Sequence, residues 1–160
     1  MHIKVMSYSK LPAAMMAGIA LSIATHAAEE SAAYAVRKEL PPVSTKKGVT
    51  FDKDIKPLFE ASCLKCHGPE KAKGDLHLDT REGVLKGSEE GPVVKEGDSA
   101  NSVIVKAIAR INPKTMMPPP PRKPRPGAEA ASAKPQSAPP KPLTDEEVGL
   151  VRAWIDQGAK

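Results

Sequence analysis

The chain has 160 residues, which is enough for one domain with short extensions. It contains 17 prolines but only two phenylalanines, so proline-rich stretches must lie outside any packed core. We find no phosphate-binding glycine loop, no nucleophile beside an evident base, and no aromatic–basic pattern. The sequence therefore gives no support to nucleotide-dependent chemistry or nucleic-acid binding.

Residues 1–27 are predicted to be a secretory signal peptide. Lys4 and Lys10 form a basic start, no acid precedes Glu29, and the apolar run 11–23 leads to small residues. This run is shorter than the roughly 20 residues that a bilayer span needs, so an uncleaved anchor is the weaker alternative. After cleavage we expect no stable membrane span. We expect an exported protein, in the periplasm, at the cell surface or secreted.

Two segments outside the predicted core are distinguished by composition. Residues 28–48 are small, polar and proline-containing, and are predicted to be a flexible lead-in. Residues 118–142 form a low-complexity proline, alanine and basic insert, predicted to be disordered or of polyproline type. Five basic residues against Glu129 give this insert a formal charge of +4, so the rest of the mature chain, which totals +3, is near −1. It is a candidate contact for an acidic partner or an anionic surface, or else a solvated spacer.

The remaining part of 49–159 is predicted to be a small all-α domain. Apolar spacing predicts helices over 54–62 and 99–110, and Asn112-Pro113 ends the second of them. Thr144 and Glu147 form a capping box for a last helix that stops near Gly158. No strand pattern is evident. Three or four short helices make a small core, so we expect another group to fill its middle.

Cys63 and Cys66 are the chain's only cysteines, and His67 follows directly. A zinc site could add His77, but Cys66 and His67 are adjacent and would both have to face one small ion. A redox dithiol would need a strand before the motif and a sheet behind it. A structural disulfide in an exported protein is the third alternative.

The pattern Cys–x–x–Cys–His favours covalent attachment of one haem c. The two thiols would bond the two vinyl groups, and the imidazole of His67 would bind iron as the proximal ligand. Export agrees with this interpretation. The apolar faces of a haem would also supply the core that the side chains lack.

Three residues are candidates for the sixth position on the iron, namely Met116, Met117 and His77. A thioether is a soft, neutral ligand that raises the reduction potential of haem iron. The prolines after Met117 stiffen the segment that would present it. His77 lies between two leucines in an alternating pattern, which predicts a solvated surface histidine.

An ordered series of motifs covers most of 49–159 outside the insert, namely Phe51-x-x-Asp54-Ile55-x-Pro57-Leu58, Cys63-x-x-Cys66-His67-Gly68-Pro69, Gly74-x-Leu76-x-Leu78-Asp79-x-Arg81-Glu82, Gly97-Asp98-x-x-x-Ser102, Met117-Pro118-Pro119, Leu143-Thr144-x-x-Glu147 and Trp154-Ile155-x-x-Gly158-Ala159. This series resembles the planctomycete-type cytochrome c domain. The resemblance implies a mono-haem fold, haem carried by Cys63 and Cys66, and axial ligation by His67 and Met117, with Met116 as second choice. The chain departs from the family pattern in its long insert and in its size.

The leading functional hypothesis is electron transfer by a non-enzymatic carrier with both axial positions filled. Its redox partner proteins are not identified by the sequence. A second hypothesis is a redox-silent haem module that docks to a larger extracytoplasmic enzyme or surface complex. A third, peroxidase-type catalysis, requires the methionine segment to leave the iron.

Overall fold

The computed structural model describes residues 34–121 and 140–160. The predicted signal peptide and most of the predicted insert lie outside these ranges and stay predictions. The described residues belong to one compact unit, Tyr34–Lys160. None of the helices within the described ranges is long and apolar enough to cross a membrane.

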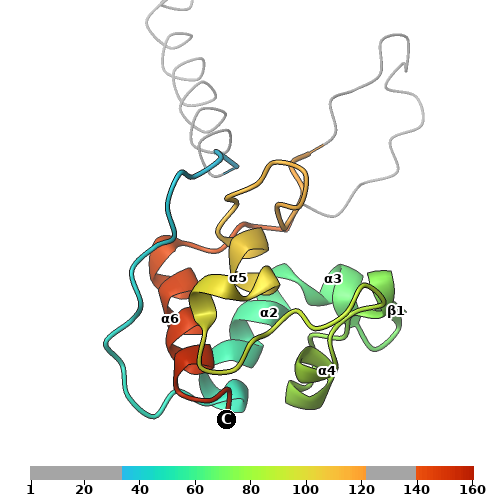
Figure 1. Cartoon of the computed structure of the whole chain (residues 1–160). Coiled ribbons are helices and arrows are strands. Elements are labelled where there is room, and N and C mark those ends of the chain that lie inside the picture. Colours follow the sequence, from blue (N-terminus) through green and yellow to red (C-terminus); the bar gives the residue numbers. More distant parts are fainter. Residues whose placement is uncertain (1–33, 122–139) are drawn as a thin grey trace, which may run out of the picture. The chain divides into compact units, whose positions relative to one another are not determined.

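Short helices make up nearly all of the regular structure in the described residues (Figure 1). The predicted helical class is confirmed, because the extended structure there is limited to a two-residue strand and isolated bridges. In chain order the elements are the π-helix η2 (Phe51–Ile55), α2 (Lys56–Ser62), α3 (Leu64–His67), β1 (Lys71–Ala72), the 3₁₀ turn η3 (Lys73–Asp75), α4 (Arg81–Lys86), the 3₁₀ turn η4 (Ser99–Asn101), α5 (Val103–Ile108) and α6 (Asp145–Asp156).

The first predicted helix, 54–62, is present but begins earlier, with the π-helical turn η2. The carboxylate of Asp54 accepts a hydrogen bond from the Thr50 amide at 2.9 Å, which holds this turn closed. The α-helix α2 starts at Lys56, so Pro57 lies in its first turn, where the missing N–H costs nothing.

The prediction of one continuous helix over 99–110 is wrong. Ser102 is extended (φ −73°, ψ 127°) and separates η4 from α5. Its hydroxyl donates to the Asp98 carbonyl at 3.0 Å and accepts from the Lys95 amide at 2.9 Å. These side-chain bonds compete with helical hydrogen bonding and break the helix.

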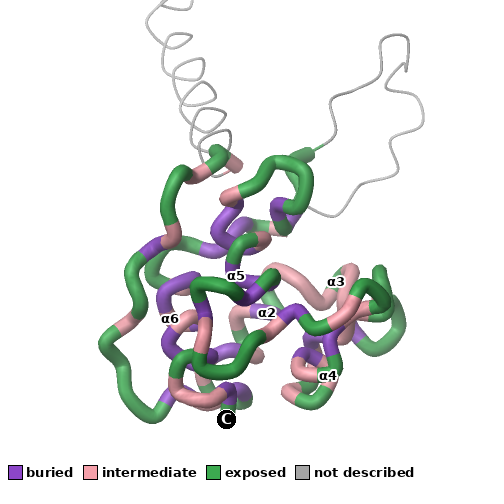
Figure 2. The backbone as a smooth tube through the Cα atoms, in the orientation of Figure 1, coloured by how far each residue is buried: buried purple, intermediate pink, exposed green. Residues whose placement is uncertain are grey.

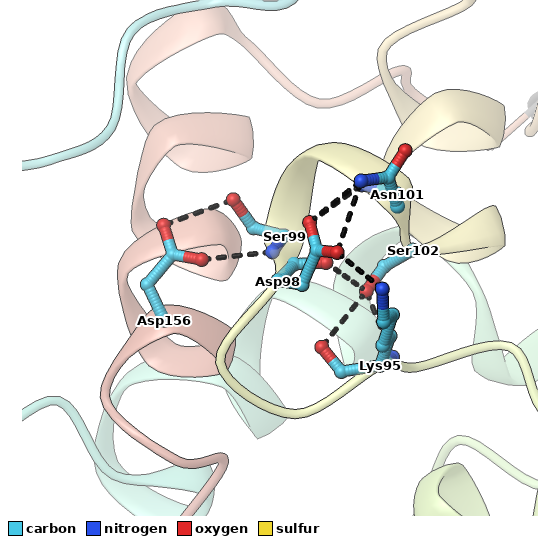
Figure 3. A network of polar contacts seen from close by, with 6 residues as sticks. All are labelled: Lys95, Asp98, Ser99, Asn101, Ser102 and Asp156. Atoms are coloured by element: carbon cyan, nitrogen blue, oxygen red, sulfur yellow. Dashed lines mark hydrogen bonds and ion pairs between the residues drawn. The ribbon is translucent and has the colours of Figure 1, made fainter.

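Asp98 bonds the residues on both sides of η4, and Ser99 bonds η4 to the last helix (Figure 3). The Asp98 carboxylate accepts from the Asn101 amide at 3.2 Å and from Lys95 Nζ at 2.6 Å. The amide and hydroxyl of Ser99 donate to the two carboxylate oxygens of Asp156 on α6, at 2.8 and 2.9 Å. The Gly-Asp-x-x-x-Ser motif therefore anchors α5 to α6.

Helix α6 supplies much of the core, and its predicted capping box is present, with Thr144 Oγ1 accepting from the Glu147 amide. Trp154 packs against Phe51 with ring centroids 5.7 Å apart, and Phe51 meets Phe59 edge-on at 6.3 Å. Buried residues are concentrated on α6 and α5, with one each on α2 and α4 (Figure 2). The larger fully buried side chains are Trp154, Phe59, Ile55, Leu143, Ile155, Val84, Val105, Val148 and Val151.

Residues 34–48, predicted as part of a flexible lead-in, make specific contacts with the helices. The Ser44 amide donates to the Gly149 carbonyl at 3.0 Å, and Arg152 donates to the Pro41 carbonyl. Leu40 packs against the core cluster. Gly149 allows this approach, because a Cβ there would lie 2.5 Å from the Pro42 carbonyl oxygen. This part of the lead-in is therefore integral to the domain.

Candidate functional site

Cys63, Cys66 and His67 lie on a tight turn that follows α2. The carbonyl of Cys63 accepts from the amides of Cys66 and His67, both at 3.0 Å, which closes the turn. The backbone then reverses in a small hairpin, with bridges pairing His67 with Ala72 and Gly68 with Lys71. The Leu78 amide donates to the His67 carbonyl at 2.8 Å. The histidine is thus held by backbone contacts on both sides of the hairpin.

The three side chains are half-buried, as Figure 2 shows for α3. Burial, reinforced by the neighbouring Cys66, raises the pKa of the Cys63 thiol to about 12. Burial also lowers the pKa of His67, with the backbone at Leu76 and Lys73 acting in the opposite direction. At neutral pH the site therefore presents a protonated Cys63 thiol and favours a neutral imidazole, the form that binds metal.

These residues fit a covalently bound haem. Both cysteines are free, as thioether formation requires. The Nδ1 atom of His67 is buried and has no hydrogen-bond partner, so this nitrogen of the imidazole is not committed to a group of the protein. Leu58, Leu64 and Leu76 pack against the core but keep part of their surface exposed, so apolar area is available beside the turn.

The alternatives for the motif find less support. In the described ranges, no three His, Cys, Asp or Glu side chains gather closely enough to hold a metal ion, so the four candidate zinc ligands do not converge. The strand and sheet that a thioredoxin-like dithiol needs are also not found among the described residues, where β1 has two residues and follows the motif. The disulfide alternative is not formed.

The two methionines differ sharply in exposure. Met116 is buried, with 7% of its surface accessible, whereas Met117 is 41% exposed. The Met117 amide donates to the Ala107 carbonyl on α5 at 3.0 Å, so its backbone is fixed to the end of that helix. Of these two methionines, Met117 is therefore the accessible one.

The imidazole of His77 lies between two carboxylates. Its Nε2 lies 3.8 Å from an Asp75 carboxylate oxygen, and its Nδ1 lies 3.8 Å from one of Asp79. Leu78 is buried and Leu76 half-buried, close to the alternation that the sequence indicates. A half-exposed histidine between two carboxylates agrees with the predicted surface role.

Two features of the described residues were not predicted from the sequence. Gly74 and Asp75 both adopt left-handed conformations, with φ of 67° and 54°, and turn the chain back toward His67. Arg110 is only 4% exposed at the end of α5. The available signals were a glycine before an aspartate and an arginine inside an apolar helix, and neither is specific by itself.

A short helical domain built around a Cys–x–x–Cys–His turn defines the class of small c-type cytochromes. Comparison with known families agrees, since residues 63–121 match the family model described as Planctomycete cytochrome C. This part of the chain is therefore similar to a family whose members are typically haem-based electron carriers rather than enzymes. The match includes the haem motif and both methionines. No curated protein and no solved structure matches the chain.

Proposed function

We propose that the chain is an exported mono-haem cytochrome c that transfers electrons, with His67 and Met117 as axial ligands. The observation that carries the proposal is the turn itself, with two free thiols and an imidazole whose buried Nδ1 has no partner. This turn lies within the segment that matches a cytochrome c family.

Each residue of the site has a separate task. The thiols of Cys63 and Cys66 bond the haem covalently and so prevent its loss outside the cell. His67 would hold the iron through its neutral imidazole, a form that burial favours. Bound haem supplies one-electron chemistry by cycling between the ferric and ferrous states. Filling both axial positions excludes substrate from the iron, which favours a carrier over a peroxidase.

Met117 is proposed as the distal ligand because of its exposure and its fixed backbone. Its side chain is accessible, whereas the buried Met116 would have to leave its packing to reach a ligand. A thioether in this position would stabilise ferrous over ferric iron and so raise the reduction potential of a bound haem.

The first test is the intact mass of the purified full-length chain, expressed in a host that matures c-type cytochromes and weighed under denaturing conditions. We expect the mass of a chain starting near Ala28 plus one haem. A chain without added haem, or one lighter by two hydrogens, would contradict the proposal, because the cysteines would then be unmodified or joined in a disulfide.

The second test compares Met117→Ala with its matched neighbour Met116→Ala by redox titration. We expect Met117→Ala to lower the reduction potential and open the iron to added ligands, while Met116→Ala keeps the wild-type spectrum and changes stability alone. The reverse pattern would assign the ligand to Met116. Equal, wild-type spectra for both variants would remove methionine from the iron.

A further inference from the structure

The end of α5 carries an arginine at a position that usually favours glycine. Arg110 has φ of 55°, in the left-handed region. Its amide donates to the Ala107 carbonyl at 3.0 Å, and the Ile111 amide donates to the Lys106 carbonyl at 3.1 Å. This is the Schellman pattern of a helix end, in which a left-handed residue with a Cβ costs about 1 kcal/mol or more. The side chain at this position must therefore contribute something that glycine cannot.

The buried guanidinium of Arg110 joins two segments that are far apart in the sequence. Its Nε donates to the Ala35 carbonyl at 3.3 Å, and its Nη1 donates to the Leu143 carbonyl at 3.4 Å. The first acceptor belongs to the lead-in, and the second immediately precedes the cap of α6. Figure 1 shows these segments meeting beside the end of α5.

Arg37 makes the complementary contacts from the lead-in. Its amide donates to the Arg110 carbonyl at 3.1 Å, its Nη1 donates to the Ala109 carbonyl at 3.5 Å, and its guanidinium pairs with Asp145 in the first turn of α6. We call Arg37, Arg110 and Asp145 the arginine clasp. It ties together the residues before and after the segment 111–142, which contains Met116 and Met117.

The same helix end holds the proposed ligand. The Ala107 carbonyl, which accepts from the Arg110 amide, also accepts from the Met117 amide. We infer that the arginine clasp positions Met117, because it fixes the helix end to which the methionine backbone is bonded. Arg37 and Arg110 are thus positioning residues for the distal ligand. This inference rests on the proposed function only for the statement that the Met117 sulfur binds iron.

The test uses two variants of the full-length haem protein. Arg110→Gly removes the guanidinium but relieves the left-handed backbone, so the helix end should still form. Arg37→Gln removes the ion pair. The control is Lys95→Gln, which breaks an ion pair with Asp98 at the opposite end of α5.

The first measurement is the affinity of ferric haem for added imidazole, which binds only when the methionine leaves. A looser clasp raises the fraction of open molecules and so raises the apparent affinity. We expect about 3- to 10-fold tighter binding in Arg110→Gly and Arg37→Gln, and no change in Lys95→Gln. Arg37→Lys should recover part of the wild-type value, because it retains the charge opposite Asp145.

The second measurement is hydrogen exchange of the Met117 amide, which does not depend on the haem. Exchange should accelerate by a similar factor in both clasp variants and not in the control. Wild-type exchange and imidazole affinity in both variants would overturn the inference while leaving the proposed function intact. A wild-type protein that binds imidazole as tightly as Met117→Ala would instead refute the assignment of Met117 as ligand. Hydrogen exchange of the Met117 amide would still test whether the arginine clasp positions this residue.

Discussion

Gly68, directly after His67, ends the turn at a point where a side chain has no room. A Cβ there would lie 2.5 Å from the Leu64 carbonyl oxygen. Its φ of −99° is ordinary, so the requirement is for space and not for a left-handed backbone. Because Gly68 has no side chain, its backbone can lie against the Leu64 carbonyl, and this close contact sets the direction in which the chain leaves His67.

We predict that Gly68→Ala destabilises the protein by about 1–3 kcal/mol and lowers the fraction of chains that carry haem. Urea unfolding and intact mass measure the two effects. The control is Gly97→Ala, where φ is +78° but an added Cβ meets nothing within 4 Å. A Gly68→Ala protein at least as stable as Gly97→Ala would show that the turn can adjust.

The carboxyl group of Asp98 makes the stability of the folded protein depend on pH. Hydrogen bonds from Lys95 and Asn101 lower the pKa of its carboxyl from 3.8 to about 2. Since the folded pKa is the lower one, the carboxylate stabilises the fold fully above about pH 4, and this contribution is lost as the pH falls toward 2.

We predict that Asp98→Asn lowers the urea midpoint at pH 7 and that the difference from wild type shrinks steadily between pH 4 and pH 2. Urea titrations at several pH values would measure this. A difference that stays constant over the range would show that the charge of Asp98 does not contribute, and that asparagine loses a contact whose strength does not depend on pH.

At the scale of elements, α6 contains a glycine where helix propensity disfavours it. Alanine is preferred to glycine inside a helix by about 1 kcal/mol. However, a Cβ at Gly149 would meet the Pro42 carbonyl oxygen at 2.5 Å, and the Gly149 carbonyl accepts from Ser44. The close contact with the lead-in therefore outweighs propensity.

We predict that Gly149→Ala destabilises the protein by about 1–3 kcal/mol, measured by urea unfolding. The same substitution in a chain that begins at residue 49 should instead be neutral or stabilising, because the opposing carbonyl is gone. Stabilisation in both backgrounds would mean that the lead-in does not pack on α6 in solution.

At the scale of the whole molecule, the segment 34–48 completes the domain. It contributes the Arg37 contacts, the core contact of Leu40, the buried Pro41 and the amide of Ser44. The helices alone form a small core, and small cores depend strongly on such additions.

We predict that a chain beginning at residue 49 is less stable than one beginning at residue 34 by at least about 3 kcal/mol, from lost hydrogen bonds and apolar burial. Urea unfolding of the two haem-loaded chains would measure the difference. As a control, Val43→Ser changes an exposed lead-in residue and should shift stability by less than about 0.5 kcal/mol. Equal stability of the two chains would restore the interpretation of 34–48 as a flexible lead-in.

The sequence by itself determined the helical class, the capping box at Thr144 and the chemistry expected of Cys63, Cys66 and His67. These features depend on local spacing, because side-chain periodicity, caps and the two-residue gap between cysteines act within a few positions of the chain.

Only the tertiary structure decided that Gly149 must lack a side chain, that Arg110 is buried, and that Met117 is more exposed than Met116. The first two follow from contacts between segments tens of residues apart. The break at Ser102 comes from nearer bonds, to Lys95 and Asp98, whose competition with helical hydrogen bonding the apolar spacing does not reveal. Local propensity carries no information about which carbonyl will lie opposite a given residue, and burial is set by all the segments that pack together. The lead-in looked flexible for the same reason, since its contacts are with helices that the sequence places far away.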